Sequence, residues 1–98
     1  MNSILVLEEA DRELQESANW YEQQSPGLGE RFIESGRAKL IFVKDHPGYY
    51  SKRKGNFREA PIDTFPFKIV FTFYKRKQMI TVSAIFHSSR NPKKKFRK

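Results

Sequence analysis

The sequence lacks cysteine and any long apolar segment, and each absence excludes a class of protein. Without cysteine, the chain of 98 residues forms neither a disulfide scaffold nor a thiolate metal site, which is compatible with a reducing intracellular compartment. The apolar run at Ile4–Leu7 is too short for the core of a signal peptide or for a membrane span, and acidic residues follow it at once. We therefore expect a cytoplasmic protein with no membrane contact and one modest hydrophobic core.

Acidic residues are scarce in the second half of the chain. Residues 51–98 contain only Glu59 and Asp63 against fourteen Lys and Arg, a net charge of +12. Residues 1–50 contain nine acidic residues against five basic ones, a net charge of −4. Solubility alone would account for the overall charge of +8 but not for its uneven placement. This polarity indicates an anionic partner, either a nucleic acid or an acidic protein.

Patterns that bind metal ions or cofactors are also missing. The only histidines, His46 and His87, are far apart in the sequence, and no carboxylate cluster stands at metal-ligand spacing. The sequence has no glycine loop that would cradle a phosphate and no nucleophile elbow. We expect no metal ion and no other cofactor.

The sharpest periodicity lies in residues 65–92 and predicts a β-hairpin, because apolar and polar residues alternate on both sides of a charged turn. With the turn at Lys75–Gln78, the predicted cross-strand pairs are Phe73 with Ile80, Phe71 with Val82, Ile69 with Ala84 and Phe67 with Phe86. These residues form one apolar face. The opposite face is then polar and carries Lys68 diagonally across from His87.

Two amphipathic helices are predicted ahead of the hairpin. The first runs from Glu8 to about Gln24, and the second follows a break at Ser25-Pro26-Gly27 and runs to about Asp45. Ser25 is the predicted N-cap of the second helix. Gly36 in the middle of that helix indicates close packing against the first. Within the first helix, Tyr21 is expected in the core and Trp20 at its margin.

Short strands are predicted at Ser3–Leu7 and Asn56–Pro61, with a loop at residues 48–55. The predicted order is βααβββ. This is an α+β fold of two layers, in which a helical hairpin packs on one face of a mostly antiparallel sheet. The other face of the sheet is left for solvent or a partner.

Two further basic segments are candidates for binding. In the predicted loop, Lys52, Arg53 and Lys54 follow two tyrosines, so this segment suits a nucleic acid or another partner, or is a solvated connector. Residues 93–98 form a basic tail beyond a single domain of residues 1–92. Its cations, which include Lys93, Lys94 and Lys95, either attract polyanions without specificity or are simply solvated.

The order of short motifs along the chain resembles a known family. These motifs are Ala18-Asn19-Trp20-Tyr21-Glu22, Pro26-Gly27-Leu28-Gly29, Arg31-Phe32, Pro47, Tyr50, Phe57-Arg58, Phe65-Pro66-Phe67 with Ile69, and Ala84-Ile85-Phe86-His87 followed by Arg90 and Pro92. Together they are similar to the RelE/ParE superfamily of toxins from bacterial type II toxin–antitoxin modules. The similarity is greatest to ParE-like members, which are often described as plasmid stabilisation proteins.

The resemblance implies the βααβββ fold and growth inhibition that a cognate antitoxin relieves, here one with an acidic segment. Two mechanisms occur in the superfamily, and the fold does not choose between them. ParE-type members poison DNA gyrase, whereas RelE-type members cut messenger RNA on the ribosome. Our leading interpretation is a ParE-like, gyrase-directed growth inhibitor. The alternative is a ribosome-dependent mRNA endonuclease, and a third option is a plain RNA-binding module.

The alternative nuclease would depend on four residues. Lys68 stands where the resemblance places an arginine of the nuclease members, and Arg58 would face the same side if Phe57 points inward. His87 would be a general acid or base, and Arg90 would stabilise charge on the phosphorane. Structural roles are the competing interpretation, with Arg58 in an ion pair and His87 hydrogen-bonded to the turn at Asn91-Pro92.

Overall fold

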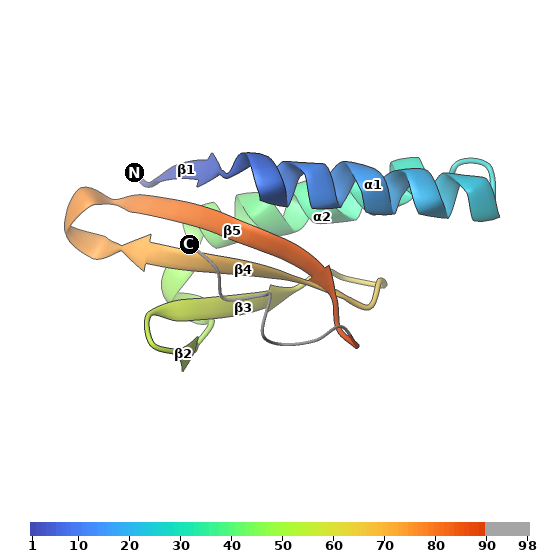
Figure 1. The fold of residues 1–98 in the computed structure, drawn as a ribbon. Coiled ribbons are helices and arrows are strands. Elements are labelled where there is room, and N and C mark those ends of the chain that lie inside the picture. Colours follow the sequence, from blue (N-terminus) through green and yellow to red (C-terminus); the bar gives the residue numbers. More distant parts are fainter. Residues whose placement is uncertain (90–98) are drawn as a thin grey trace.

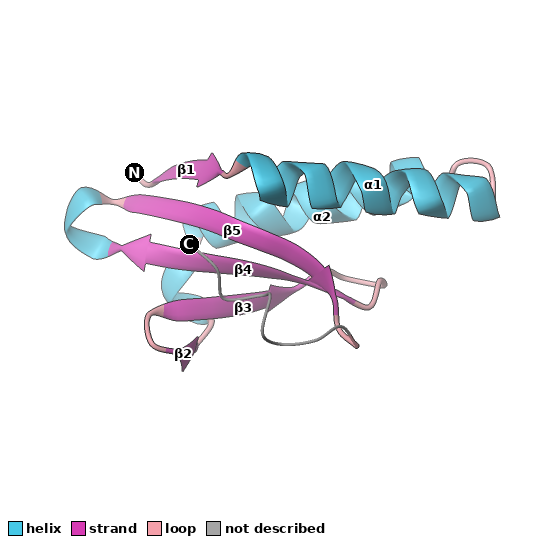
Figure 2. Ribbon diagram, viewed as in Figure 1, coloured by secondary structure: helices cyan, strands magenta, loops and turns pink. Residues whose placement is uncertain are grey.

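The protein consists of a helical layer packed on one face of a five-stranded sheet (Figures 1 and 2). The computed structural model describes residues 1–89. Its elements are β1 (Ser3–Val6), α1 (Glu8–Gln24), α2 (Leu28–Asp45), β2 (Lys52–Lys54), β3 (Phe57–Pro61), β4 (Phe67–Tyr74) and β5 (Met79–His87), with short 3-10 segments η1 (Pro47–Tyr49) and η2 (Lys75–Lys77). The strand order is β1-β5-β4-β3-β2, and only β1 is parallel to its neighbour.

The predicted α+β architecture is confirmed, with one strand added. β2 lies where a loop was predicted, and it forms the edge of the sheet beside β3. Gly55 has a φ of 57°, so the chain turns back sharply and lays Lys52–Lys54 against β3. All three residues of β2 are exposed cations, and they therefore lack the apolar alternation by which a strand is predicted.

An aromatic cluster fills the core between the helices and the sheet. The rings of Tyr21, Phe32, Phe65 and Phe67 lie with centroids 4.9 to 6.0 Å apart, mostly edge to face. Tyr21 packs against this core as predicted, and Trp20 remains 58% exposed at its margin. No helix within residues 1–89 is long and apolar enough to cross a membrane.

The joint between the helices depends on Glu22 rather than on Ser25, so the predicted N-cap is wrong. The carboxylate of Glu22 accepts hydrogen bonds from the backbone N–H groups of Gly27 and Gly29, at 2.9 and 3.0 Å. Gly27 precedes α2 with a φ of 86°, a conformation that favours glycine. A side chain from the last turns of α1 thus satisfies the first donors of α2.

Two glycines let the helices approach each other closely. A Cβ on Gly36 would lie 3.1 Å from the Cδ1 atom of Leu14, which confirms that this glycine packs against the first helix. Gly29 is tighter still, because a Cβ there would lie 2.4 Å from the carbonyl oxygen of Ala18. The backbones of α1 and α2 are in contact at this point.

The β4–β5 hairpin is present, but its predicted register holds only near the turn. Phe73 pairs with Ile80 and Phe71 with Val82 as predicted, and the register then shifts between Phe71 and Val70. Ser83 is the extra residue, because Val70 pairs with Ala84. From there on the observed partners are Ile69 with Ile85, Lys68 with Phe86 and Phe67 with His87.

Beyond this bulge, each residue of β5 lies on the opposite face of the sheet from the face that was predicted for it. Ile85, rather than Phe86, joins the core beneath the helices. Ala84 and Phe86 instead form a second buried cluster with Val70, against which Phe57 packs. The outer face, predicted to be polar, is therefore apolar at its centre, and the predicted positions of Ala84, Ile85 and Phe86 are wrong.

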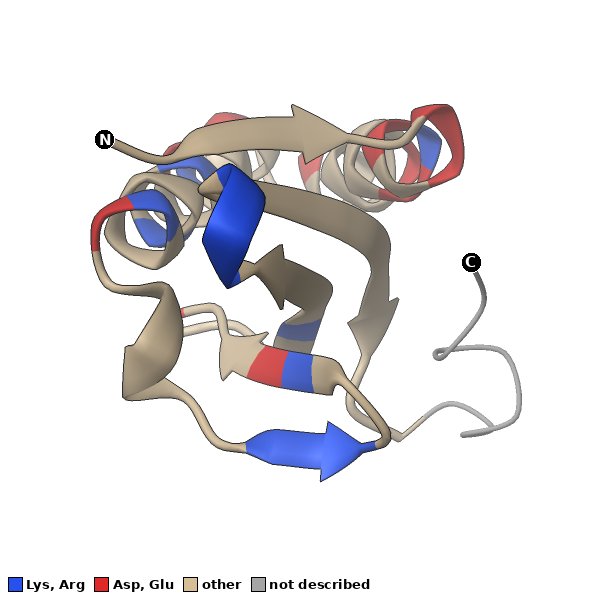
Figure 3. Ribbon diagram, turned by 90° about the vertical axis from the view of Figure 1, so that its left-hand side faces the viewer, with Lys and Arg blue, Asp and Glu red and all other residues tan. Residues whose placement is uncertain are grey.

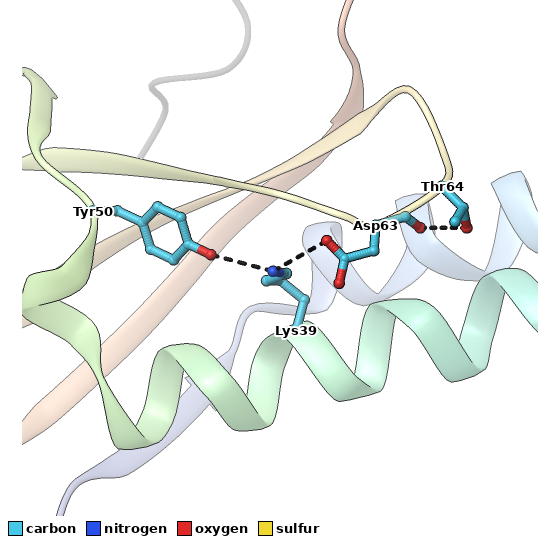
Figure 4. Close-up of polar contacts among 4 residues, drawn as sticks. All are labelled: Lys39, Tyr50, Asp63 and Thr64. Carbon is cyan, nitrogen blue, oxygen red and sulfur yellow. Dashed lines mark hydrogen bonds and ion pairs between the residues drawn. The ribbon is translucent and has the colours of Figure 1, made fainter.

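Lys39 connects α2 to the two ends of the β2–β3 segment (Figure 4). Its ammonium group lies 3.2 Å from the Tyr50 hydroxyl and 3.4 Å from Oδ1 of Asp63, and its side chain is only 13% exposed. Burial by itself lowers the pKa of Lys39, but the hydrogen bonds and charges of Tyr50 and Asp63 outweigh it and raise the pKa above 10.5. The Lys39 ammonium group is thus protonated at neutral pH.

Gly29→Ala is predicted to destabilise the fold, because the added methyl group overlaps a backbone carbonyl that cannot move without separating the helices. The free energy of unfolding, measured with urea, should fall by at least about 2 kcal/mol. Gly48→Ala is the matched control, since a Cβ there meets no atom within 4 Å. It should change stability by less than about 0.5 kcal/mol. Equal effects of the two substitutions would contradict the close helix contact.

Lys39→Met is predicted to lower the free energy of unfolding by about 1 to 2 kcal/mol at pH 7, because it leaves the Tyr50 hydroxyl without its partner. A pKa raised by folding gives stability that is complete below the unfolded value of 10.5 and is lost as the pH rises through the folded value. The difference between wild type and variant should therefore be constant near neutral pH and shrink above about pH 10.5.

Urea unfolding over that pH range measures this difference. Lys77→Met is the control, because Lys77 is exposed and makes no ion pair within residues 1–89. A stability difference that is unchanged in strong alkali would argue against the charged link.

Candidate functional site

The residues proposed for nuclease chemistry are not brought together. Arg58 and Lys68 lie on opposite faces of the sheet, and His87 lies at the end of β5 on the helical side. Arg90 lies outside the described residues, as do Lys93, Lys94 and Lys95 of the basic tail.

Arg58 points toward the helical layer, and the expectation that it shares a face with Lys68 is wrong. It pairs with Phe71, a core residue, whereas Phe57 pairs with Thr72 and packs on the outer cluster. Since side chains on a strand alternate, an outward Phe57 requires an inward Arg58. Its Nη1 atom donates to the carbonyl oxygen of Tyr50 at 2.6 Å, and its Nε atom is buried without a hydrogen-bond acceptor within residues 1–89.

Lys68 lies on the outer face, where it shares a buried carboxylate with Arg53. The Oε1 atom of Glu59 is 3.5 Å from Nζ of Lys68 and 3.8 Å from Nε of Arg53. The Glu59 side chain is only 5% exposed, whereas that of Arg53 is 60% exposed. The three side chains line a cavity of about 360 Å³ together with Tyr49 and Tyr50. An anion that enters this cavity meets two cations but also a fixed negative charge.

His87 lies on the helical side because of the bulge at Ser83, so the predicted diagonal pair with Lys68 is wrong. Its Nδ1 atom is 2.8 Å from Oγ of Ser89 and accepts a hydrogen bond from the backbone N–H of Ser89 at 3.2 Å. Its ring packs edge-on against Phe67, with centroids 5.3 Å apart. The partner of His87 is therefore Ser89, and the predicted partner, the turn at Asn91-Pro92, lies outside the described residues.

A groove beside His87 was not predicted. It has a volume of about 690 Å³ and runs between α1 and the end of β5, where Trp20 and Tyr21 line it with Phe67 and Ile85. Glu13 of α1 also lines it, and its carboxylate accepts the backbone N–H of Ile85 at 2.9 Å. The exposure of Trp20 is the clearest sign of this groove, and the sequence alone does not distinguish an exposed Trp20 from a marginal core residue.

A second groove, also not predicted, lies at the basic end of the molecule. At this end β2 and η2 each consist of the triplet Lys-Arg-Lys, and both segments are blue in Figure 3. Lys52 of β2 and Lys75 of η2 line the same groove of about 450 Å³. The signal in the sequence is the repeated triplet. The fold brings the two copies together, whereas 20 residues separate them in the chain.

Within residues 1–89, no group of three or more His, Cys, Asp or Glu side chains is arranged to hold a metal ion.

Comparison with known proteins identifies the fold and the family. The sequence model of the family described as "ParE toxin of type II toxin-antitoxin system, parDE" matches residues 4–92. Comparison with curated proteins gives no match.

Three solved structures share the fold. A chain of the chromosomal ParDE system from P. aeruginosa aligns with a TM-score of 0.63 at 16% identity, over 89% of this chain and 96% of that one. A chain of the intact E. coli RelBE toxin–antitoxin complex gives 0.61 at 14% identity, over 92% and 100%. The isolated E. coli RelE toxin gives 0.58 at 15% identity, over 94% and 89%.

The matched segment takes in both helices and every strand of the sheet apart from the first residue of β1. The resemblance drawn from the short motifs is thereby confirmed. The chain belongs to the ParE toxin family of type II toxin–antitoxin systems, within the wider RelE/ParE superfamily.

Proposed function

We propose that the protein is a gyrase-directed growth inhibitor that acts in the cytoplasm by binding rather than by cleavage. The observation that carries this proposal is that Arg58, Lys68 and His87 do not converge. Lys68 lies on the other face of the sheet from the other two, and His87 pairs with Phe67, four residues along β4 from the Phe71 that Arg58 pairs with. Cleavage of a phosphodiester needs an acid, a base and cations within hydrogen-bond reach of one phosphate. The arrangement favours a binding surface over such a centre.

The buried carboxylate of Glu59 supports the same conclusion. This carboxylate lies between Lys68 and Arg53 and already neutralises much of the positive charge that would otherwise attract a phosphate. A reaction that builds up negative charge on a phosphorane gains less from cations that are already paired with a carboxylate. We therefore assign these residues to the stability of the outer face rather than to chemistry.

The partner that relieves the inhibition is proposed to be a cognate antitoxin with an acidic segment. Two of the three similar structures are described as toxin–antitoxin systems or complexes. The net charge of +12 on residues 51–98 is complementary to an acidic chain. The antitoxin would cover the helical hairpin and the basic surface of the sheet, as a helix in a groove or as an added strand.

Induction of this chain alone in bacteria is predicted to stop growth, and purified protein is predicted to stabilise breaks that gyrase makes in plasmid DNA. Gyrase supercoiling assays and gels of plasmid cleavage measure the second effect. Co-expression of a small acidic open reading frame adjoining the gene should restore growth. Normal growth after induction would overturn the toxin assignment, and growth arrest with unaffected gyrase would overturn the choice of target.

His87→Ala and Lys68→Met are each predicted to keep full growth inhibition, because neither residue performs chemistry in this proposal. Mapping of transcript ends after induction should give no new cuts with wild type or with either variant. The alternative of a RelE-like mRNA endonuclease predicts cuts with wild type that disappear in both variants while the circular dichroism spectra stay native. That pattern would replace the present proposal with the nuclease.

A further inference from the structure

The groove at the basic end is formed by an interruption of the sheet. β3 begins at Phe57, which pairs with Thr72, so β3 does not accompany β4 along Phe73 and Tyr74. The groove of about 450 Å³ lies at this corner. Its walls come from β2, from the start of β3 and from the last residues of β4 with the first of η2.

The cations around the groove are available to an outside anion. Lys52 and Lys75 line it, and Arg76 and Lys77 follow on η2; all four are exposed and make no ion pair within residues 1–89. The two acidic residues of this half of the described chain face other cations. Glu59 is shared by Arg53 and Lys68, and Asp63 lies against Lys39. The positive potential of the groove is therefore not neutralised by either of them.

Arg58 adds a fixed donor to the same groove. Its guanidinium is anchored by the carbonyl oxygen of Tyr50, yet its buried Nε–H has no acceptor within residues 1–89. A guanidinium carries five N–H donors in a planar fork that suits phosphate oxygens. Because the Nε atom is buried, a phosphate in the groove would be bound by the terminal N–H groups of the guanidinium rather than by Nε–H.

An aromatic ring lines the groove beside these cations. Tyr74 is 48% exposed and stands at the end of β4, next to Lys75. A carboxylate of an acidic peptide gains little from an aromatic face, whereas every nucleobase stacks on one. Cations that follow a phosphate backbone next to an exposed aromatic ring are the combination found in sites for single-stranded nucleic acid.

We propose that this groove binds single-stranded nucleic acid, with a backbone phosphate at Arg58 between Lys52 and Lys75 and a base stacked on Tyr74. This site goes beyond the growth inhibition proposed above and is independent of the gyrase target. It is also distinct from the Lys68–Glu59–Arg53 cluster on the outer face, with which it shares no lining residue.

The test is the binding of a fluorescein-labelled single-stranded DNA oligonucleotide of mixed sequence to the full chain made by cell-free synthesis, followed by fluorescence anisotropy. Lys52→Gln with Lys75→Gln should raise the Kd about tenfold or more at low salt. It should also reduce the slope of log Kd against log salt by about 1.4, since each phosphate contact to a single strand contributes about 0.7. Tyr74→Ala should weaken binding about fivefold or more, and Tyr74→Phe should keep it.

Arg31→Gln with Arg37→Gln is the matched control, because it removes the same charge from exposed positions on α2 and leaves the groove intact. It should change the Kd by less than about twofold. All variants keep the basic tail, and their circular dichroism spectra and melting temperatures should match those of the wild type. The groove double variant and the control double variant have the same net charge, so a difference in Kd between them reports where the charge was removed.

Several outcomes would overturn the proposal. One is an equal loss of affinity in the α2 control, which would mean attraction by net charge alone. Others are no binding of the oligonucleotide at low salt, tighter binding to the duplex of the same sequence, or complete displacement by polyglutamate with no effect of Tyr74→Ala. The last result would assign the groove to an acidic protein instead.

Discussion

The bulge at Ser83 decides which surface each residue near the end of β5 occupies. Before this point β5 is paired with β1 on one side and with β4 on the other. The pairing with β1 ends at Leu7, the residue after β1, whose backbone N–H donates to the carbonyl oxygen of Val82. Beyond it, α1 takes over the open side, with the Glu13 carboxylate on the N–H of Ile85. One extra residue thus coincides with the change from a strand neighbour to a helix neighbour. The same shift moves His87 to the helical side and Phe86 to the outer face.

The bulge explains why the sequence predicts the hairpin but not its faces. Alternation fixes the register near the turn, where Phe71, Phe73, Ile80 and Val82 lie as predicted. Ala84, Ile85 and Phe86 are all apolar, so a shift of one residue still places an apolar side chain toward the helices. Hydrophobic patterning cannot detect such a shift, and every site inferred from the predicted face is affected by it.

Other features escaped prediction because they depend on contacts between distant residues. Glu22 satisfies the start of α2 although Ser25 has the more familiar N-cap character, since only the packed hairpin brings the carboxylate to Gly27 and Gly29. Glu59 is likewise an isolated acidic residue in the basic half of the sequence, and only the folded sheet makes it the common partner of Arg53 and Lys68. Fold class, helix positions and family followed from local periodicity and motif order, whereas the polar clusters required the assembled sheet.

The outer carboxylate cluster and the basic groove differ in how firmly the fold holds their residues. Glu59 and Lys68 of the outer cluster lie on the paired strands β3 and β4, whereas the basic groove sits at a corner where β3 stops short of β4. At this corner the side chains of Lys52, Tyr74 and Lys75 remain exposed. This corner is a natural place for a ligand that is recognised by its backbone charge.

The charge of β2 has a consequence for the behaviour of the protein in a crowded cell. Edge strands are templates for unwanted pairing between molecules, and short strands with lysine are one of the ways in which natural sheets avoid it. β2 is an edge strand of three residues, all of them cationic and exposed. Pairing of two such edges would place like charges opposite each other, so this margin of the sheet resists self-association and aggregation while remaining attractive to anions.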